Sequence, residues 1–392
     1  MAQKKILTMN KIAQIGLDRF NDDYTISDSM EQPDAIMVRS ASLHDMEMPE
    51  SLLAIARAGA GTNNIPIDRC SEQGIAVFNT PGANANAVKE LVIAGLLIAS
   101  RRVIPAIEWA KGLKGNGAEV GKMVEKGKSQ FAGPEIKGKK LGVIGLGAIG
   151  VMVANTAYSL GMDVLGYDPY LSIDAAWSLS RWTHHAATLD EIFAQCDYIS
   201  LHVPLNDETR GMIDSAAIAK MKDGVRILNF ARADLVDGAS IVDAVKNGKV
   251  GCYVVDFPTD EVLGVEGIVA IPHLGASTPE SEDNCAIMAA DELRWYLRDG
   301  TVRNSVNLPN LDGGRAEKNR ICIIHKNIPN MLAQFSTVFS NAGINIENLL
   351  SKSKKDIAYT QIDFDSDVSD ELVAALNAID GIIRVRVIIP GN

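Results

Sequence analysis

Three side chains of different chemical type follow the ends of apolar segments in the second half of this chain: Arg232, Glu261 and His273. An imidazole can take a proton from a substrate hydroxyl, and a carboxylate beside it can hold the ring and stabilise its protonated form. A guanidinium can bind a substrate carboxylate through two parallel hydrogen bonds. We therefore predict acid–base chemistry at Arg232, Glu261 and His273. On their own, the three residues are equally compatible with unrelated loop side chains.

A glycine motif supplies the setting for that chemistry. The apolar run 141–144 predicts a buried strand, G-x-G-x-x-G follows at 145–150, and 151–160 has helical composition. A second apolar run, 162–167, ends at Asp168. Strand, glycine turn, helix, strand and acid occur here in the order of a dinucleotide-binding site.

Each residue of the motif has a physical task. Gly145 permits the tight turn, Gly147 lets backbone N–H groups approach a pyrophosphate, and Gly150 lets the helix pack close to the strand. Asp168 is placed to accept hydrogen bonds from the ribose hydroxyls of the adenosine. Because no Arg or Lys follows directly at 169–170 to meet a 2′-phosphate, we predict NAD rather than NADP.

Composition excludes several other classes of function. The chain has 392 residues, enough for two or three domains, with 38 Lys+Arg against 49 Asp+Glu and a net charge of −11. An acidic chain disfavours binding to nucleic acid and to anionic membranes. The five cysteines are scattered and lack a C-x-x-C pair, which predicts buried free thiols, no metal site and a reducing, cytoplasmic location.

The rhythm of apolar and helical segments predicts an α/β protein with two doubly wound, Rossmann-like domains and a smaller α+β domain. We place a substrate domain at 1–97 and 279–308, interrupted by a nucleotide-binding domain at 98–278. The helix predicted for 279–298 would return the chain to the first domain. After a linker, residues 316–392 show the order β-α-β-β-α-β of a ferredoxin-like split.

A helix is also predicted for 88–110, followed by a stretch from 111 to 140 with eight lysines and three glutamates. A solvated linking loop is the simplest interpretation of this charge run. The alternative is that one or two of its lysines attract an anionic substrate.

Several motifs together resemble the D-2-hydroxyacid dehydrogenases over residues 1 to about 308. They are the glycine motif with Tyr-Asp-Pro at 167–169, Leu-His-Val-Pro-Leu at 201–205, Asn-Phe-Ala-Arg at 229–232, and Pro-His-Leu-Gly-Ala-Ser-Thr at 272–278. Val-Arg-Ser at 38–40 and Gly-Thr-Asn-Asn at 61–64 are similar to the branch of that family that oxidises D-3-phosphoglycerate with NAD.

The resemblance implies roles for individual residues. The family's catalytic Arg, Glu and His fall on Arg232, Glu261 and His273. The sequence around Glu261 departs from the family pattern, so Asp260 is a rival for the carboxylate. Implied cofactor-binding residues are Gly145, Gly147, Ala148, Ile149, Gly150, Asp168, His202, Pro204 and Asp256. Implied substrate-binding residues are Arg39, Ser40, Gly61 and Asn63, of which Arg39 and Ser40 would contact the phosphate.

The tail resembles an ACT domain, a module that binds small regulatory molecules. The resemblance implies an L-serine site at His325, Asn327 and Asn345, and a homodimer or homotetramer. The family usually has glycine where Asn330 stands, and a purely oligomerising ACT domain is the alternative. The implied activity is the first step of serine synthesis. A dehydrogenase of an unphosphorylated acid (glycerate, hydroxypyruvate or lactate) and a non-catalytic, NAD-sensing corepressor are the rival functions.

Overall fold

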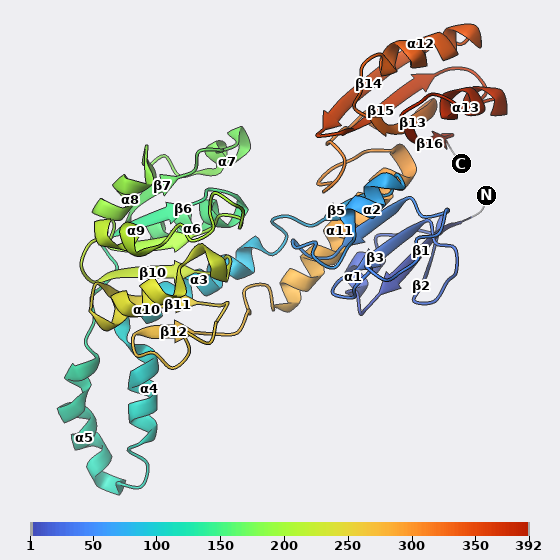
Figure 1. Cartoon of the computed structure of the whole chain (residues 1–392). Coiled ribbons are helices and arrows are strands. Elements are labelled where there is room, and N and C mark those ends of the chain that lie inside the picture. Colours follow the sequence, from blue (N-terminus) through green and yellow to red (C-terminus); the bar gives the residue numbers. More distant parts are fainter. Residues whose placement is uncertain (1–2, 391–392) are drawn as a thin grey trace. The chain divides into compact units, whose positions relative to one another are not determined.

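The computed structural model describes residues 3–390 and divides them into two compact units, which we describe separately (Figure 1). One unit comprises the chain up to Asn84 and from Pro279 onward, and the other is Ala85–Thr278. The first crossover thus lies at residues 84–85, whereas the sequence placed it after residue 97. No helix in this described range is long and apolar enough to cross a membrane.

The first unit is built on a parallel sheet with the strand order β2-β1-β3-β4-β5. Its central strands are short apolar segments, and all four residues of β3 are buried. Polar residues that follow the carboxyl ends of these strands therefore meet at one edge of the sheet. The elements are β1 (Lys4–Met9), α1 (Gln14–Leu17), β2 (Tyr24–Ser27), β3 (Ala35–Val38), β4 (Ala54–Arg57), α2 (Ile67–Glu72), β5 (Ala76–Asn79) and α11 (Pro279–Asp299).

The second unit is a doubly wound domain with a parallel sheet in the order β12-β11-β10-β9-β6-β7-β8. The order reverses at β6, the strand that runs into the glycine motif, so the motif lies at the switch point where such sheets bind ligands. The strands are β6 (Lys140–Ile144), β7 (Asp163–Tyr167), β8 (His184–His185), β9 (Tyr198–Leu201), β10 (Val225–Asn229), β11 (Val250–Val255) and β12 (Ile268–Ala270).

Helices cover both faces of this sheet, as its two separate apolar cores require. On one face, the side chains of α3 pack with those of α6 over the buried strands β6, β10 and β11. The helices are α3 (Ala85–Arg101), α6 (Ala148–Ser159), α7 (Ile173–Ser178), α8 (Leu189–Gln195), α9 (Ser215–Lys220), η3 (Ala233–Leu235) and α10 (Gly238–Lys246).

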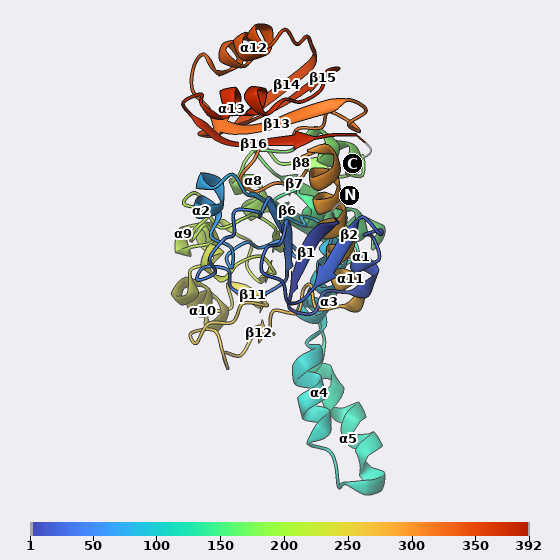
Figure 2. The same ribbon diagram turned by 90° about the vertical axis from the view of Figure 1, so that its right-hand side faces the viewer.

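The lysine-rich stretch is not a linking loop. The helix predicted for 88–110 breaks at Arg102, which adopts φ 44°, and a helical hairpin follows. Figures 1 and 2 show its two legs side by side, extending away from the sheet of the second unit, and the rings of Trp109 and Phe131 pack 5.4 Å apart. The hairpin contains α4 (Val103–Lys111), η1 (Gly117–Glu119), α5 (Val120–Gly127) and η2 (Lys128–Phe131). Its lysines at 111, 122 and 128 pair with glutamates one turn earlier.

The C-terminal region has the predicted element order β-α-β-β-α-β, with an antiparallel sheet in the order β14-β15-β13-β16. Its two helices cover one face of this sheet around a core that includes Phe335, Phe339 and Phe364. The elements are β13 (Asn319–Lys326), α12 (Met331–Asn341), β14 (Ile346–Lys354), β15 (Ile357–Phe364), α13 (Asp370–Asn377) and β16 (Ile382–Ile388).

The other face of that antiparallel sheet packs on α11 within the same unit. Tyr359 is fully buried, its ring lies 6.4 Å from that of Tyr296 on α11, and its hydroxyl donates to the carbonyl of Gly300. Gln361 donates to the same carbonyl at 2.7 Å. The sheet therefore shares one apolar core with α11 and the first parallel sheet.

All five cysteines are free and buried, as the sequence predicted. Burial raises the pKa of the Cys70, Cys196, Cys252 and Cys285 thiols, to about 12 at Cys196, so none of these four is poised as a nucleophile.

Candidate active site

The glycines in the turn between β6 and α6 have different structural roles: two are required by the backbone, and one leaves space for a ligand. Gly145 adopts φ 91°, and a Cβ on it would come within 2.6 Å of the carbonyl oxygen of His202. A Cβ on Gly150 would lie 1.9 Å from the carbonyl oxygen of Gly145, so α6 approaches β6 only because this residue lacks a side chain. A Cβ on Gly147, at the N-cap of α6, would meet nothing within 4 Å. The space above Gly147 is what an approaching pyrophosphate requires.

Asp168 is half-buried at the end of β7 and fixes the same turn. Its carboxylate accepts hydrogen bonds from the backbone N–H groups of Leu146 and Tyr170, both at 2.8 Å. Each carboxylate oxygen has a second lone pair, so ribose hydroxyls can still bind there. Ala148 and Ile149 open α6 directly after Gly147.

His202 and Pro204 follow β9, next to the glycine turn. The His202 ring shares a hydrogen bond of 2.8 Å with the hydroxyl of Ser200, and burial lowers the pKa of His202 to about 4. The ring is therefore neutral and held by this hydrogen bond, and it is a poor proton acceptor. The carbonyl of Pro204 accepts a hydrogen bond from Thr209.

Asp256 closes the site at the end of β11. It is 1% exposed, and one of its carboxylate oxygens, Oδ1, has no hydrogen-bond partner within the described residues. Burial raises the pKa of Asp256 to about 6, against the attraction of Arg232. A buried polar atom without a partner is costly unless a ligand completes it. The open glycine cradle and this orphaned oxygen both fit a nicotinamide dinucleotide.

The side chains of Arg232 and His273 both lie near the aromatic ring of Phe257. The ring of His273 lies 4.2 Å from that of Phe257, and the guanidinium carbon of Arg232 lies 5.5 Å from the same Phe257 ring. Desolvation, together with the charge of Arg232, lowers the pKa of His273 below its ordinary value. The imidazole is therefore neutral, and able to accept a proton, down to lower pH than usual.

Asn229, which the sequence analysis quoted only within a motif, sets the turn that carries Arg232. This fully buried side chain donates to the carbonyl of Arg232 at 2.8 Å and to the hydroxyl of Tyr253, and it accepts from the N–H of Ala231. The signal in the sequence is an amide at the end of an otherwise apolar strand.

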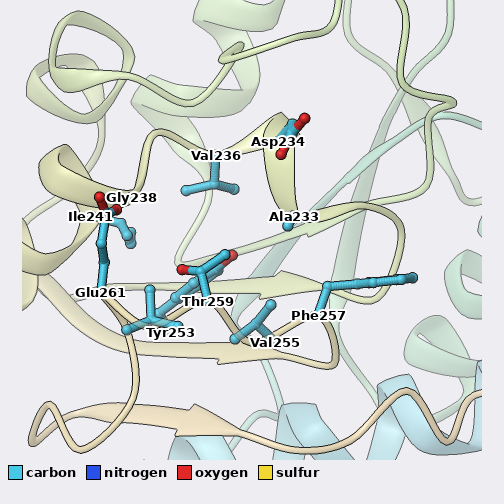
Figure 3. A pocket seen from close by; sticks show the side chains of 11 residues that line it. Ala233, Asp234, Val236, Gly238, Ile241, Tyr253, Val255, Phe257, Thr259 and Glu261 are labelled. Carbon is cyan, nitrogen blue, oxygen red and sulfur yellow. The ribbon is translucent and has the colours of Figure 1, made fainter.

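Glu261 lies elsewhere. Figure 3 shows it beside Gly238 and Ile241, at one end of a pocket that has Phe257 at the other end. A Cβ on Gly238 would lie 2.0 Å from a carboxylate oxygen of Glu261, so a side chain at the start of α10 would displace this carboxylate. In the part of the chain that the structure describes, no hydrogen bond joins Glu261 to His273. The structure thus brings Arg232 and His273 together without the predicted carboxylate.

The predicted phosphate-contacting residues lie in the first unit. Arg39 and Ser40 follow β3, and Asn10 accepts hydrogen bonds from the N–H groups of Ser40 and Ala41 at 3.0 and 2.7 Å. Gly61 follows β4 in the loop 58–64. Asn63 lies in the same loop, and its carbonyl is within 3.0 Å of a ring nitrogen of His44.

Arg57, at the end of β4, connects these two segments. Its Nε donates to the carbonyl of Arg39 at 2.9 Å, and its Nη1 donates to the carbonyl of Gly61. Arg57 was not among the predicted site residues, although a cation at the end of an apolar strand is itself a signal.

The Arg39 side chain is not free in this structure. Its Nη2 pairs with Glu282 of α11 at 2.6 Å, and both side chains are partly exposed, at 43% and 44%. A bound anion would have to compete with Glu282 for this guanidinium.

In the C-terminal region, His325 is 3% exposed and both of its ring nitrogens have partners. Nδ1 lies 2.8 Å from the carbonyl of Lys326, and Nε2 lies 2.9 Å from the hydroxyl of Thr360. Asn327 donates to the carbonyl of Lys355, and Asn345 is exposed just before β14. The exposed side chain of Asn345 is therefore accessible to a ligand, whereas His325 could bind one only after giving up a hydrogen bond that it already makes.

The backbone conformation at Asn330 shows why asparagine can stand where the family usually has glycine. It is the N-cap of α12 and adopts φ 71°. Asparagine enters this left-handed region more readily than other residues with a side chain, so the turn is kept.

No cluster of His, Cys, Asp and Glu within residues 3–390 is arranged to hold a metal ion. The chemistry of the candidate site therefore rests on the guanidinium of Arg232, the imidazole of His273 and the open glycine turn at the start of α6.

Comparison with known proteins agrees with this chemistry. Residues 93–275 match the family described as D-isomer specific 2-hydroxyacid dehydrogenase, NAD binding domain. The chain is 30% identical to a D-3-phosphoglycerate dehydrogenase of Haemophilus influenzae, over 98% of this chain and 95% of that protein.

Two further relatives have sequence identities slightly above and slightly below this value. A D-3-phosphoglycerate dehydrogenase of Archaeoglobus fulgidus is 36% identical over 71% of this chain, which spans about half (52%) of that longer protein. The crystal structure of a 3-phosphoglycerate dehydrogenase from Entamoeba histolytica with NAD⁺ bound is 28% identical, with a TM-score of 0.60 over 79% of this chain and 100% of that chain. The chain described here belongs to the D-isomer-specific 2-hydroxyacid dehydrogenases and is an oxidoreductase that uses NAD.

Proposed function

We propose that this enzyme oxidises D-3-phosphoglycerate to 3-phosphohydroxypyruvate, the first step of L-serine synthesis. The observation that carries the proposal is the pairing of Arg232 and His273 on the ring of Phe257, beside the orphaned carboxylate oxygen of Asp256. The names of the relatives support the choice of substrate. Bound NAD⁺ supplies the hydride acceptor.

His273 takes the proton of the C2 hydroxyl, and Arg232 binds the substrate carboxylate and polarises the developing carbonyl. Because the pKa of His273 is lowered by desolvation and by Arg232, the rate of oxidation should fall only when the pH drops below the ordinary histidine value. We expect His273→Ala to reduce kcat by a factor of 10² to 10⁴ with little change in the Kd of NADH measured by fluorescence. Equal losses of catalysis and NADH binding would remove His273 from this role.

Glu261 is proposed as the carboxylate that assists His273 once its side chain leaves Gly238, with Asp260 as the rival. Comparing the pH–rate profiles of Glu261→Gln and Asp260→Asn decides between them, because loss of the true partner lowers the pKa of the catalytic imidazole. If neither profile shifts, His273 acts without a carboxylate.

Arg39 is proposed to bind the substrate phosphate, with Ser40, Gly61 and Asn63 shaping the surrounding loops. The rival within enzymes, a dehydrogenase of an unphosphorylated acid, is tested by steady-state rates on D-glycerate against D-3-phosphoglycerate. We expect Arg39→Ala to raise KM for the phosphorylated substrate and to leave that for glycerate unchanged. A preference for glycerate would select the rival, and measurable turnover of either acid excludes a non-catalytic corepressor.

The C-terminal region is proposed to be a ferredoxin-like ACT domain that binds L-serine and takes part in a homodimer or homotetramer. Its element order and the exposed amide of Asn345 support the proposal. We expect millimolar L-serine to suppress NADH formation, and Asn345→Ala to abolish that inhibition, as should Asn327→Ala. Asn341→Ala, an exposed amide at the end of α12, is the matched control. Turnover indifferent to serine would leave the domain as an assembly module.

A further inference from the structure

A second polar hollow lies within the first unit, and none of the predicted site residues lines it. It is lined by the end of β14, by the loop that follows α11, and by the last residue of β5. Its volume is about 610 Å³. The lining residues are Asn79, Asn304, Ser305, Val306, Pro309, Asn310, Lys352, Ser353 and Lys354.

The pleat of β14 brings both lysines to the same side. Lys352 lies opposite Tyr359 and Lys354 opposite Ile357 in the antiparallel register. Tyr359 and Ile357 both pack into the core shared with α11, so Lys352 and Lys354 face the first parallel sheet and its loops. The ammonium group of Lys354 donates to the carbonyl of Ser305 at 2.8 Å, which fixes its direction.

The charge in this hollow is uncompensated. Its lining contains two ammonium groups, three side-chain amides and no carboxylate, in a chain whose net charge is −11. Neither Lys352 nor Lys354 forms an ion pair within residues 3–390. Desolvation, together with the neighbouring Lys355, lowers the pKa of Lys354, so an anion beside it would relieve an existing electrostatic cost.

We propose that this hollow is a binding site for a small dianion, either a phosphate group or a pair of carboxylates, held by Lys352 and Lys354 with the amide of Asn310. The site is distinct from the proposed serine positions, and binding there needs neither substrate nor NAD.

A chain of hydrogen bonds connects the hollow to the loop that carries Gly61. Asn79 lines the hollow, and its amide donates to the carbonyl of Ala60 at 2.5 Å. The next carbonyl, that of Gly61, accepts from Arg57, which also holds the carbonyl of Arg39. Occupancy of the hollow should therefore change KM for the phosphorylated substrate, and this consequence alone rests on the proposed function.

The test is isothermal titration of the full chain with inorganic phosphate, without substrate or NAD. If Arg39 also binds phosphate, the wild type should show two sites: Arg39→Gln removes one, and Lys352→Gln/Lys354→Gln weakens the other at least tenfold. If Arg39 binds none, the single site should still be lost in the double lysine variant. A parallel titration with malonate tells a phosphate site from a dicarboxylate site.

Two further variants keep the result interpretable. Lys318→Gln/Lys326→Gln removes the same charge from the C-terminal region outside the hollow, at two lysines that do not shift the pKa of Lys354, and should leave binding unchanged. Asn310→Asp adds a repelling charge without touching the Lys354–Ser305 contact, and should also weaken binding tenfold. The proposal is overturned if neither anion binds outside Arg39, or if the control pair loses as much affinity as Lys352→Gln/Lys354→Gln.

Discussion

At the scale of single residues, the pairing of Arg39 with Glu282 matters most for the proposed substrate. A phosphate dianion and the Glu282 carboxylate are alternative partners for one guanidinium, and the exposure of both side chains keeps the existing ion pair weak. If Arg39 binds the substrate phosphate as proposed, Glu282 would lower the affinity for phosphate by competing for the same guanidinium.

We therefore expect Glu282→Gln to lower KM for D-3-phosphoglycerate by about two- to fivefold, the equivalent of one exposed ion pair, with kcat unchanged. Steady-state kinetics at constant ionic strength measure the effect. Glu280→Gln, in the same first turn of α11, is the control and should leave KM as it is. A higher KM in Glu282→Gln would show that Arg39 needs this carboxylate to be held in place.

At the scale of elements, the turn from β6 into α6 contains two glycines with different reasons to be glycine. Gly150→Ala forces a methyl group against the carbonyl of Gly145, whereas Gly147→Ala places one in open space. We expect Gly150→Ala to destabilise the protein by about 1–3 kcal/mol. Gly147→Ala should stay within about 0.5 kcal/mol of wild type while its NADH affinity falls at least tenfold.

Urea unfolding and NADH fluorescence titration separate the two effects. If Gly147→Ala kept full NADH affinity, the backbone at that position would not face the pyrophosphate.

The helix α11 carries a buried acid, Glu292, which is 1% exposed and accepts one hydrogen bond from Asn304. Burial raises its pKa from 4.5 to about 8. The folded protein therefore holds a proton that the unfolded chain releases, so stability falls as the pH rises from about 4.5 to about 8.

Glu292→Gln removes this dependence. We expect the variant to be more stable than wild type by roughly 3 kcal/mol at pH 7, with the gain shrinking toward zero near pH 4.5. Thermal melts at pH 5 and pH 8 measure it, with Glu280→Gln as the exposed control. A gain that is equal at both pH values would mean that Glu292 is not protonated in the fold.

At the scale of the whole molecule, Arg320 ties the antiparallel sheet to the end of α11. This side chain is 1% exposed, pairs with Asp363 through two bonds of 2.6 and 2.9 Å, and donates to the carbonyl of Asp299. Two further bonds reach the carbonyls of Gly313 and Gly314 in the linker. The linker is therefore held at Gly313 and Gly314 rather than left as a free tether.

Arg320→Met leaves these acceptors unpaired, and we expect a loss of about 3–5 kcal/mol. Limited proteolysis should then cut near residues 313–318, and urea unfolding gives the magnitude. Arg303→Gln removes an exposed pair with Asp312 and should cost less than about 1 kcal/mol. Resistance to proteolysis in Arg320→Met would show that the shared apolar core alone holds the sheet.

The sequence by itself determined the elements that depend on local pattern. The spacing of apolar, glycine and acidic residues predicts the glycine motif with Asp168, the α/β order and the β-α-β-β-α-β tail. It can do so because the strand pleat and the helix turn repeat over only a few residues. The same local logic predicted Arg232 and His273 after the ends of apolar segments. These segments are β10 and β12, which flank β11 in the sheet, and both side chains lie against Phe257 at the end of β11.

Only the tertiary structure decided which side chains face each other across distant segments. The spacing of residues did not predict that Glu261 lies against Gly238 or that Glu282 forms an ion pair with Arg39. It also did not predict that Arg57 links the loops after β3 and β4. The lysine run became a helical hairpin because pairs one turn apart and the Trp109–Phe131 contact stabilise helices that charge alone would leave open. These outcomes depend on packing between residues far apart in the chain, which a one-dimensional pattern does not encode.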